Sequence, residues 1–586
     1  MNFRPPMSTK SWLLSLIVFF GIFLWALNFT YPLIGHDYLL FLPKLLAGNW
    51  HFAHQGFFPF RFTPHFCGGL PMYGNPQDMY YSLPQILTFV LEPWVAIQAS
   101  LSVMLLVGYV GWYLFSRDVL RFPSPWAHLL SLIILSNGFY LLHMIVGHLT
   151  FHTVPLLGLL LWILYDRRID KPRSLILRAS GFALTSAYAL YAGYPIVLVF
   201  AAMAAILLLP LDLLLSEHRR ERFYLLLRRA LLCGGAALLL GASKLIAIWS
   251  FMRFFPRLYP FDAFTEKSAS TLLFIARSFW YIPQGRFLFE SAGIAWGTHE
   301  YSMFLSPVTL MGLLCGGALL IKKRKWLGTH KKRAAALALY AVLLTIFFAQ
   351  VTRGYGVIPT VLQKLPLLQS LHVTSRFLYL FSLFISAAGI FCIHACIRAW
   401  NIQKWEHFCF IFASIFTLIA LPIAYLPLLQ SPELGSAVDY ESIRVQLHPP
   451  AYLDRPVAYV QEGKLDLQHV IDGTTALHCF EPLFGYYGEY WTTSLTEGSA
   501  ERENDGSFNL LHPACFQYPE ENFCKPGDRI VASDRENFEN FRAGLAVTWK
   551  LSRLQTVSDW ASLLTLTFTV FFLFWAFGTK IMAFRK

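Results

Sequence analysis

The residues best suited to chemistry gather in one segment, from about Thr30 to Glu92, directly after the first long apolar run. A His-Asp pair, His36-Asp37, stands where that run ends. A charge at the edge of a bilayer is costly and usually faces a cavity, a partner or water. A carboxylate there, followed by aromatic surface, has the composition that sugar handling on a lipid carrier needs. The structural alternative is that Asp37 caps a short amphipathic helix beginning at Tyr38.

The rest of this segment interleaves polar side chains with aromatic ones. Its charged or titratable residues after Asp37 include His51, His54, Arg61, His65 and Asp78. Aromatic rings offer surface to sugars and lipid chains, whereas phosphates need donors such as Arg or His. An interfacial aromatic belt with snorkelling cations would have the same composition without a ligand.

Basic residues near the ends of other apolar runs are candidate phosphate ligands. Lys244 lies near the end of one run, and Arg253 and Arg257 follow it, so the three could bind an anionic headgroup. Lys244 could equally snorkel to the interface. Arg376 stands where a loop enters an apolar run, where it could fork onto a phosphate or anchor a helix end.

A third group consists of the histidines His143, His148 and His152. His148 and His152 are four residues apart, a spacing that a divalent metal could use on one helix face. A turn is expected to interrupt the helix here, however, and no carboxylate is adjacent in sequence. We therefore expect hydrogen-bonded structural histidines and no metal site, with a divalent metal as the less favoured alternative.

The composition identifies the class of protein. Of the 586 residues, 56% are hydrophobic and only 14% are charged, beyond the range of ordinary globular domains. The formal net charge of +13 could suggest nucleic acid, but the basic residues fall in short clusters between apolar runs, as in membrane proteins. The sequence thus predicts an integral membrane protein with no nucleic-acid partner.

A membrane-spanning helix needs about 20 apolar residues, and we find about twelve candidate spans. They are 12–34, 94–115, 126–146, 150–165, 175–192, 195–215, 230–252, 302–321, 334–351, 376–397, 407–428 and 559–579. With the N-terminus inside, every even-numbered span exits into a basic loop, as the positive-inside rule requires. These basic segments are Arg117/Arg121, 166–173, 218–229, 322–333, 398–404 and 580–586. Both termini are therefore expected in the cytoplasm.

This topology predicts three regions. Residues 1–429 form a transmembrane domain whose first outer loop covers 35–92, residues 430–558 form an extracytoplasmic soluble domain, and 559–586 form the last span with a basic tail. The fold class is an all-α polytopic membrane protein with a small mixed α/β or β-rich C-terminal domain. If that domain is exported, a Cys515–Cys524 bridge is expected.

Several short motifs, in their order along the chain, resemble those of bacterial polytopic glycosyltransferases of the GT-C superfamily, especially the YfhO-like branch. The resemblance covers most of the membrane region. The motifs are Gly35-His36-Asp37, Gly74 to Gln77, Val146-Gly147-His148, His299-Glu300-Tyr301 and Leu365 to Phe377.

The resemblance implies that Asp37 is the catalytic base of an inverting transfer. The donor would be a polyprenyl-phosphate sugar, and the acceptor a hydroxyl of a glycan, a lipid or a cell-envelope polymer. It implies that Arg376, followed by Lys244 and Arg257, binds the donor phosphate. The remaining substrate-binding candidates are His36, Arg61, His65, Asp78, His148 and Glu300.

The resemblance also implies a location. Two alternatives stay open, a transporter or flippase and a structural membrane scaffold built around the exported domain. The enzyme would lie in the bacterial cytoplasmic membrane, in contact with its lipids, with the active site on the outer face. The 430–558 domain is a candidate for acceptor recognition. A transporter or flippase of a lipid-linked saccharide would explain the spans and basic sites equally well, although the chain shows no internal repeat.

Overall fold

The structure is a computed structural model of the chain. It describes residues 9–168, 171–255, 275, 278–279, 298–322, 331–354, 356–364, 373–430, 438–444, 451–464, 467–478 and 494–584. Arg257 and most of the segment between the spans predicted at 230–252 and 302–321 lie outside these residues.

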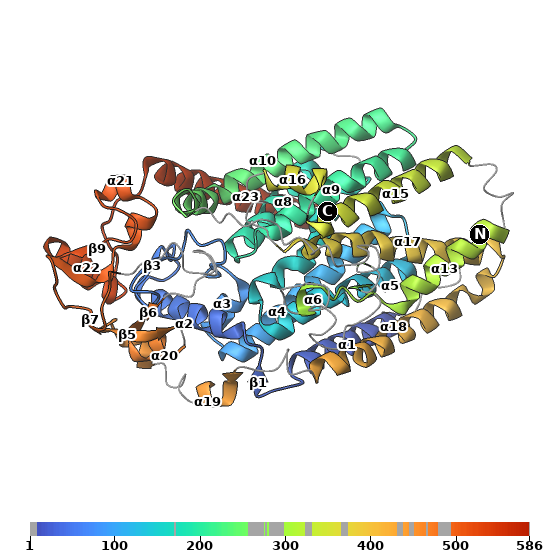
Figure 1. Ribbon diagram of the computed structural model, residues 1–586. Helices are drawn as coiled ribbons and strands as arrows, with labels where there is room; N and C mark the ends of the chain where they lie inside the picture. Colours follow the sequence, from blue (N-terminus) through green and yellow to red (C-terminus); the bar gives the residue numbers. More distant parts are fainter. Residues whose placement is uncertain are drawn as a thin grey trace.

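Eight helical segments in these ranges are long and apolar enough to cross a membrane. They lie in α4 (Pro93–Leu114) with η1 (Phe115–Val119), α5 (Ser124–Leu135) with α6 (Gly138–Val146), α9 (Ile196–Leu215), α10 (Arg219–Met252), α15 (Lys331–Arg353), η5 (Thr374–Phe377) with α17 (Leu378–Ala399), η6 (Gln403–Trp405) with α18 (Glu406–Leu429), and α23 (Arg553–Phe584). Most of them run in the same general direction along the molecule (Figure 1). The prediction of an all-α membrane protein is confirmed at this level.

The remaining predicted spans coincide with helices that are shorter or less apolar. Three apolar stretches of 10–17 residues lie in α1 (Thr9–Leu27), in η2 (Leu149–Leu156) with α7 (Leu157–Tyr165), and in α13 (Pro307–Lys322). The span predicted at 175–192 coincides with α8 (Pro172–Tyr191), which carries Arg173 and Arg178 and is not among the eight. The count of about twelve spans is therefore not confirmed.

The segment after the first apolar helix folds into a buried helix and short strands. After β1 (Leu33–Ile34), α2 (Tyr38–Gln55) has most of its residues buried. The strands β2 (Phe62–Thr63) and β3 (Leu70–Pro71) pair antiparallel, and α3 (Leu83–Thr88) follows. Both α3 and α4 have capped N-termini, because the Ser82 hydroxyl and the Glu92 carboxylate accept backbone N–H bonds there.

The described C-terminal elements include both helices and strands. They are β4 (Val438–Asp439), α19 (Tyr440–Arg444), η8 (Ala451–Asp454), β5 (Tyr459–Lys464), α20 (Leu467–Asp472), β6 (Thr474–His478), β7 (Gly498–Ser499), β8 (Ser507–Leu511), η10 (Pro513–Phe516), α21 (Pro519–Asn522), β9 (Arg529–Val531), η11 (Ala532–Asp534) and α22 (Arg535–Arg542). The strands form a β6-β5-β7 sheet and a β8-β9 pair, while β4 pairs with β1. Cys515 and Cys524 form a disulfide.

These C-terminal elements gather at one end of the molecule beside α2 and β3 (Figure 1). Backbone contacts join them to the first loop, since Leu511 N–H donates to the Gly68 carbonyl at 2.8 Å. The Gly68 N–H in turn donates to the Thr475 hydroxyl at 2.8 Å. The first loop is thus held between the helices and the C-terminal elements.

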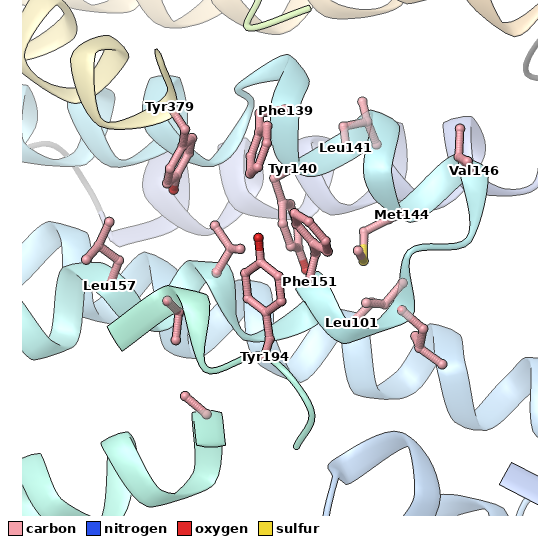
Figure 2. Close-up of a cluster of buried hydrophobic side chains, with 14 of the residues drawn as sticks. Leu101, Phe139, Tyr140, Leu141, Met144, Val146, Phe151, Leu157, Tyr194 and Tyr379 are labelled. Carbon is pink, nitrogen blue, oxygen red and sulfur yellow. The ribbon is translucent and has the colours of Figure 1, made fainter. Parts of the chain in front are cut away.

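Two further helical pieces, η3 (Thr298–Glu300) and α16 (Val357–Gln363), complete the described helices. Packing of large apolar side chains joins the helical segments to one another. Figure 2 shows buried Phe139, Tyr140, Phe151, Tyr194 and Tyr379, which come from α6, η2, the α8–α9 connection and α17. The rings of Phe151 and Tyr194 lie 4.0 Å apart, and those of Phe139 and Tyr379 lie 5.2 Å apart.

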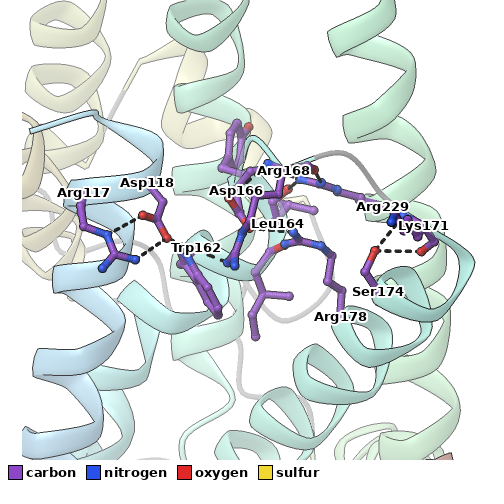
Figure 3. A network of polar contacts seen from close by, with 12 residues as sticks. Arg117, Asp118, Trp162, Leu164, Asp166, Arg168, Lys171, Ser174, Arg178 and Arg229 are labelled. Carbon is purple, nitrogen blue, oxygen red and sulfur yellow. Dashed lines mark hydrogen bonds and ion pairs between the residues drawn. The ribbon is translucent and has the colours of Figure 1, made fainter. Parts of the chain in front are cut away.

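A network of charged residues lies where α7 ends (Figure 3). Asp166 accepts a bond from Arg178 at 2.6 Å, and Arg229 donates to the Arg168 carbonyl at 2.8 Å. His148 directly precedes and Asp166 directly follows the helical segment Leu149–Tyr165. The network and His148 therefore lie at opposite ends of one apolar element.

Candidate functional site

Two glycine-containing segments, 35–37 and 145–147, lie against each other although more than a hundred residues separate them. The Asp37 N–H donates to the Val146 carbonyl at 3.0 Å. A Cβ on Gly35 would lie 2.2 Å from the Ile145 carbonyl oxygen, closer than any side chain can approach. Only glycine fits this contact.

The partner segment has a similar requirement at Gly147. Its φ of +105° is a conformation that side chains rarely adopt, and a Cβ there would lie 2.5 Å from the Tyr38 nitrogen. The Tyr38 hydroxyl donates to the Met144 carbonyl at 2.7 Å, which fixes the start of α2 on α6. Both glycines are therefore needed to bring Asp37 beside His148.

The Asp37 side chain does not cap the helix that it precedes. Asp37 occupies the N-cap position of α2, but its carboxylate makes no capping hydrogen bond. Instead, one carboxylate oxygen contacts His148 Nε2, and the other lies 3.5 Å from His36 Nε2. The carboxylate is 25% exposed. The helix-cap interpretation is correct for the residue's position and wrong for its side chain.

Glu300 is the centre of a second set of contacts, and only 2% of its side chain is exposed. Arg376 Nε donates to Glu300 Oε2 at 2.8 Å, and Arg376 Nη2 contacts Oε1. His143 Nε2 lies 3.3 Å from Oε2, and His299 Nε2 lies 3.8 Å from Oε1. A forked arginine and two imidazoles thus surround one buried carboxylate.

The rings of His143, His148 and His299 connect the two sets of contacts. The His148 and His299 ring centres are 5.0 Å apart, and those of His143 and His148 are 5.1 Å apart. Phe151 contacts both sets, because the centre of its ring lies 4.2 Å from that of His143 and 5.2 Å from the Arg376 guanidinium carbon. Asp37 and Arg376 therefore belong to one continuous polar cluster, which contacts Phe151, one of the buried aromatic residues labelled in Figure 2.

Burial and neighbouring charges determine the ionisation of this cluster. Burial raises the pKa of Asp37, but His148, His36 and His299 outweigh it, and the pKa falls to about 2. Burial likewise raises the pKa of Glu300, yet Arg376 and His143 hold it well below its ordinary value. Burial lowers the pKa of His299 well below its usual range. At neutral pH the two carboxylates are ionised and His299 is neutral.

Five residues that the sequence singled out meet here, namely Asp37, His36, His148, Glu300 and Arg376. Two members were missed as site residues, His143 and His299. His143 was noticed only as part of a histidine group with His148, and His299 only as the first letter of a motif. The signal that could have identified them is their position in the sequence. Both lie near ends of apolar segments that the predicted topology places on the same side of the membrane as Asp37.

Lys244 and Asp78 pair with each other instead. Lys244 Nζ lies 3.0 Å from Asp78 Oδ2, and the two side chains are 0% and 2% exposed. The lysine also lies 4.9 Å from the centre of the Tyr73 ring. A buried lysine with a buried counterion has the features of a structural pair, so its assignment to a donor phosphate stays a prediction.

Arg61 and His65 also have partners within the fold. Arg61 Nη2 lies 2.6 Å from an Asp559 carboxylate oxygen on α23. The His65 ring is fully buried, with its centre 4.6 Å from that of Trp50, and burial lowers its pKa to about 3. Arg257, the remaining predicted phosphate ligand, lies outside the described residues.

The aromatic part of the first loop lines a cavity of about 580 Å³. The lining includes Trp50, His51, His54 and Arg61 from the loop and Trp549 from the segment before α23. This is the surface that the sequence suggested for substrate, and Asp37 is not among its lining residues.

Two groups in the described part of the chain have the side chains to hold a metal. His143, His148, His299 and Glu300 form the first, and their ligating atoms all lie within 4.8 Å of one another. The second contains His512, Cys515 and Cys524, but its two cysteines are joined in the disulfide. In the first group, by contrast, no ligating atom is part of a disulfide.

Comparisons with known proteins add no relative. No protein-family model, no curated protein and no solved structure matches this chain.

Proposed function

We propose that the chain is a membrane glycosyltransferase that moves a sugar from a polyprenyl-phosphate donor to an acceptor hydroxyl. The observation that carries the proposal is the contact of Asp37 with His148. This contact holds the partly exposed Asp37 carboxylate away from the N-terminus of α2, at the edge of the apolar segments. A group retained there at a cost usually has a function.

In the proposed reaction the acceptor oxygen attacks the anomeric carbon from the face opposite the phosphate. A new carbon–oxygen bond forms as the bond to the phosphate oxygen breaks, and the electron pair leaves with the polyprenyl phosphate. The Asp37 carboxylate takes the hydroxyl proton. Positioned general-base help of this kind contributes roughly 10²- to 10⁴-fold to the rate.

Charge on the leaving phosphate requires a positive partner. Arg376 supplies one within the same cluster, and its side chain remains 17% exposed above Phe151. Its fork onto Glu300 fixes the guanidinium in one orientation. A guanidinium that is already fixed in position needs less reorganisation when negative charge develops on the leaving phosphate. This supports a role for Arg376 at the donor phosphate.

The proposed site faces the outside of a bacterial cytoplasmic membrane, and both termini are cytoplasmic. The Cys515–Cys524 disulfide supports this orientation, because such bonds persist in oxidising compartments. The arginine-rich network at Asp166, which lies at the other end of the Leu149–Tyr165 helix from His148, supports it too. The described elements within 430–558 would form an extracytoplasmic domain beside the first loop.

The test uses the full-length protein, purified and reconstituted into vesicles with a panel of polyprenyl-phosphate sugars. We expect release of free lipid phosphate from at least one donor, with the sugar appearing on an added acceptor or in water. Movement of a labelled donor between leaflets with no release would favour a transporter and overturn the proposal.

A further inference from the structure

Three imidazole rings in the cluster are arranged around a common point. The ring centres of His143, His148 and His299 lie 5.1, 5.2 and 5.0 Å apart in pairs. Their planes are inclined to one another by 62°, 84° and 79°. Three nearly equal separations with nearly perpendicular planes form a propeller, and Glu300 lies 3.3 Å from the His143 ring nitrogen.

The spacing agrees with that of three histidines on a tetrahedral ion. A Zn–N bond of about 2.0–2.1 Å puts each ring centre about 3.2 Å from the metal, so neighbouring centres lie about 5.2 Å apart. The three observed separations agree with this value to within a few tenths of an ångström. The ligating atoms are less tightly converged, since they span up to 4.8 Å, and small side-chain movements would complete the contact.

The contacts of His143 place its Nε2 opposite the Glu300 carboxylate, where a cation could lie between them. Its Nδ1 lies 2.6 Å from the Phe139 carbonyl oxygen, which can only accept, so Nδ1 carries the hydrogen. In the neutral ring, Nε2 is then an acceptor facing the Glu300 carboxylate at 3.3 Å. Two acceptors at this distance need a proton or a metal ion between them.

The neighbouring contacts are those expected around metal ligands. Metal-binding histidines usually donate their second nitrogen to a carbonyl or a carboxylate, which fixes the ring. The Phe139 carbonyl does this for His143, and Asp37 contacts His148 at Nε2, so coordination through Nδ1 would keep that contact. Arg376 orients Glu300.

From this arrangement we propose that His143, His148, His299 and Glu300 bind one divalent cation of the zinc class. Three imidazoles and one carboxylate suit Zn²⁺ and its neighbours in the first transition row, whereas Mg²⁺ and Ca²⁺ prefer oxygen ligands. The ion would join η3 to α6 and hold His148 against Asp37. The proposal reverses the sequence-based expectation of no metal and does not depend on the transfer reaction proposed above.

The test measures the metal content of the full-length protein, purified in detergent with an affinity tag that contains no histidine. The protein is stripped with chelator, loaded with Zn²⁺, and freed of excess ion before elemental analysis. We expect about one zinc per chain, and less than about 0.2 in His143→Ala and His299→Ala. His152→Ala and His512→Ala are the controls and should keep the full amount, because neither residue belongs to the four.

Wild-type protein that retains less than about 0.2 zinc per chain after loading would overturn the proposal. So would equal zinc in His143→Ala and His152→Ala, and the cation at His143 would then be a proton. Should the alanine variants fail to fold, the cobalt-loaded wild type decides. Intense visible bands of four-coordinate Co²⁺ are expected, and a weak six-coordinate spectrum would contradict the assignment.

Discussion

The buried pair of Asp78 and Lys244 allows a quantitative test of whether a predicted phosphate ligand is structural. The two charges are 3.0 Å apart, and both side chains are almost completely buried. Asp78 also accepts the Tyr80 N–H at 3.1 Å through its other oxygen. Removing either partner would leave the other charge buried without a counterion.

The expected loss follows from this burial. Breaking a buried pair typically costs about 3–5 kcal/mol, because an uncompensated charge remains. At 3.0 Å and an effective dielectric constant of about 20, the direct attraction is itself about 5.5 kcal/mol. We expect Asp78→Asn and Lys244→Met each to lower the free energy of unfolding by about 3–5 kcal/mol. The double variant should lose less than the sum, with a coupling energy of at least about 2 kcal/mol.

The assay is SDS-induced unfolding of the purified protein in mixed micelles. Glu503→Gln is the matched control, since Glu503 and Arg535 form a 2.6 Å pair whose side chains are 47% and 58% exposed. Such a surface pair should contribute less than about 1 kcal/mol. If Lys244→Met instead unfolds like the wild type and loses donor binding, the structural interpretation is refuted and Lys244 is a phosphate ligand.

Three further predictions concern backbone fit, pH and the arginine fork. Gly35→Ala should lose about 1–3 kcal/mol of stability and most of the activity, whereas Gly235→Ala, whose Cβ would meet nothing within 4 Å, should lose neither. The folded-state pKa of His65 is about 3, below its ordinary value of about 6.5, so protonation of His65 does not affect stability well above pH 6.5 and destabilises the fold increasingly as the pH falls towards 3. Between pH 6.5 and 5, the free energy of unfolding should therefore fall by about 1.6 kcal/mol less in His65→Gln than in the wild type, and equal slopes would contradict this. Arg376→Lys keeps a charge beside Glu300 but cannot form the two-pronged contact, so the kcat/KM for lipid-phosphate release should fall at least about tenfold in a protein that still folds. Unchanged kinetics would exclude a role of this contact in the reaction.

The sequence was most informative about where apolar segments begin and end. Because the motifs at Asp37, His148, Glu300 and Arg376 all fall at such ends, they could be expected to lie on one face. The positions of these ends depend only on the local length and hydropathy of each apolar segment. They can therefore be predicted without knowing how the helices pack. The number of spans is not confirmed by the same reasoning, since α8 is helical but carries two arginines and is not among the eight long apolar helices.

Which side chains meet could not be predicted, because pairing depends on helix packing. Arg376 was expected at a phosphate and is found forked onto Glu300, whose partner in sequence, His299, was not recognised. Asp37 has the expected N-cap position, but its carboxylate turns to a histidine from a segment more than a hundred residues away. Gly35 and Gly147, which permit this contact, belong to the sequence motifs. Only the folded backbone shows which steric clashes they avoid.

The most direct test of the proposed transfer is the turnover rate of Asp37→Asn with a donor that the wild type uses. Asp505→Asn is the control, because Asp505 is 85% exposed and has a positive φ that asparagine also tolerates. Lipid-phosphate release is measured at saturating donor, with the unfolding midpoint checked for each protein. We predict at least roughly 100-fold slower turnover in Asp37→Asn and wild-type turnover in Asp505→Asn. Wild-type turnover by a folded Asp37→Asn protein would contradict the assignment of Asp37 as the base.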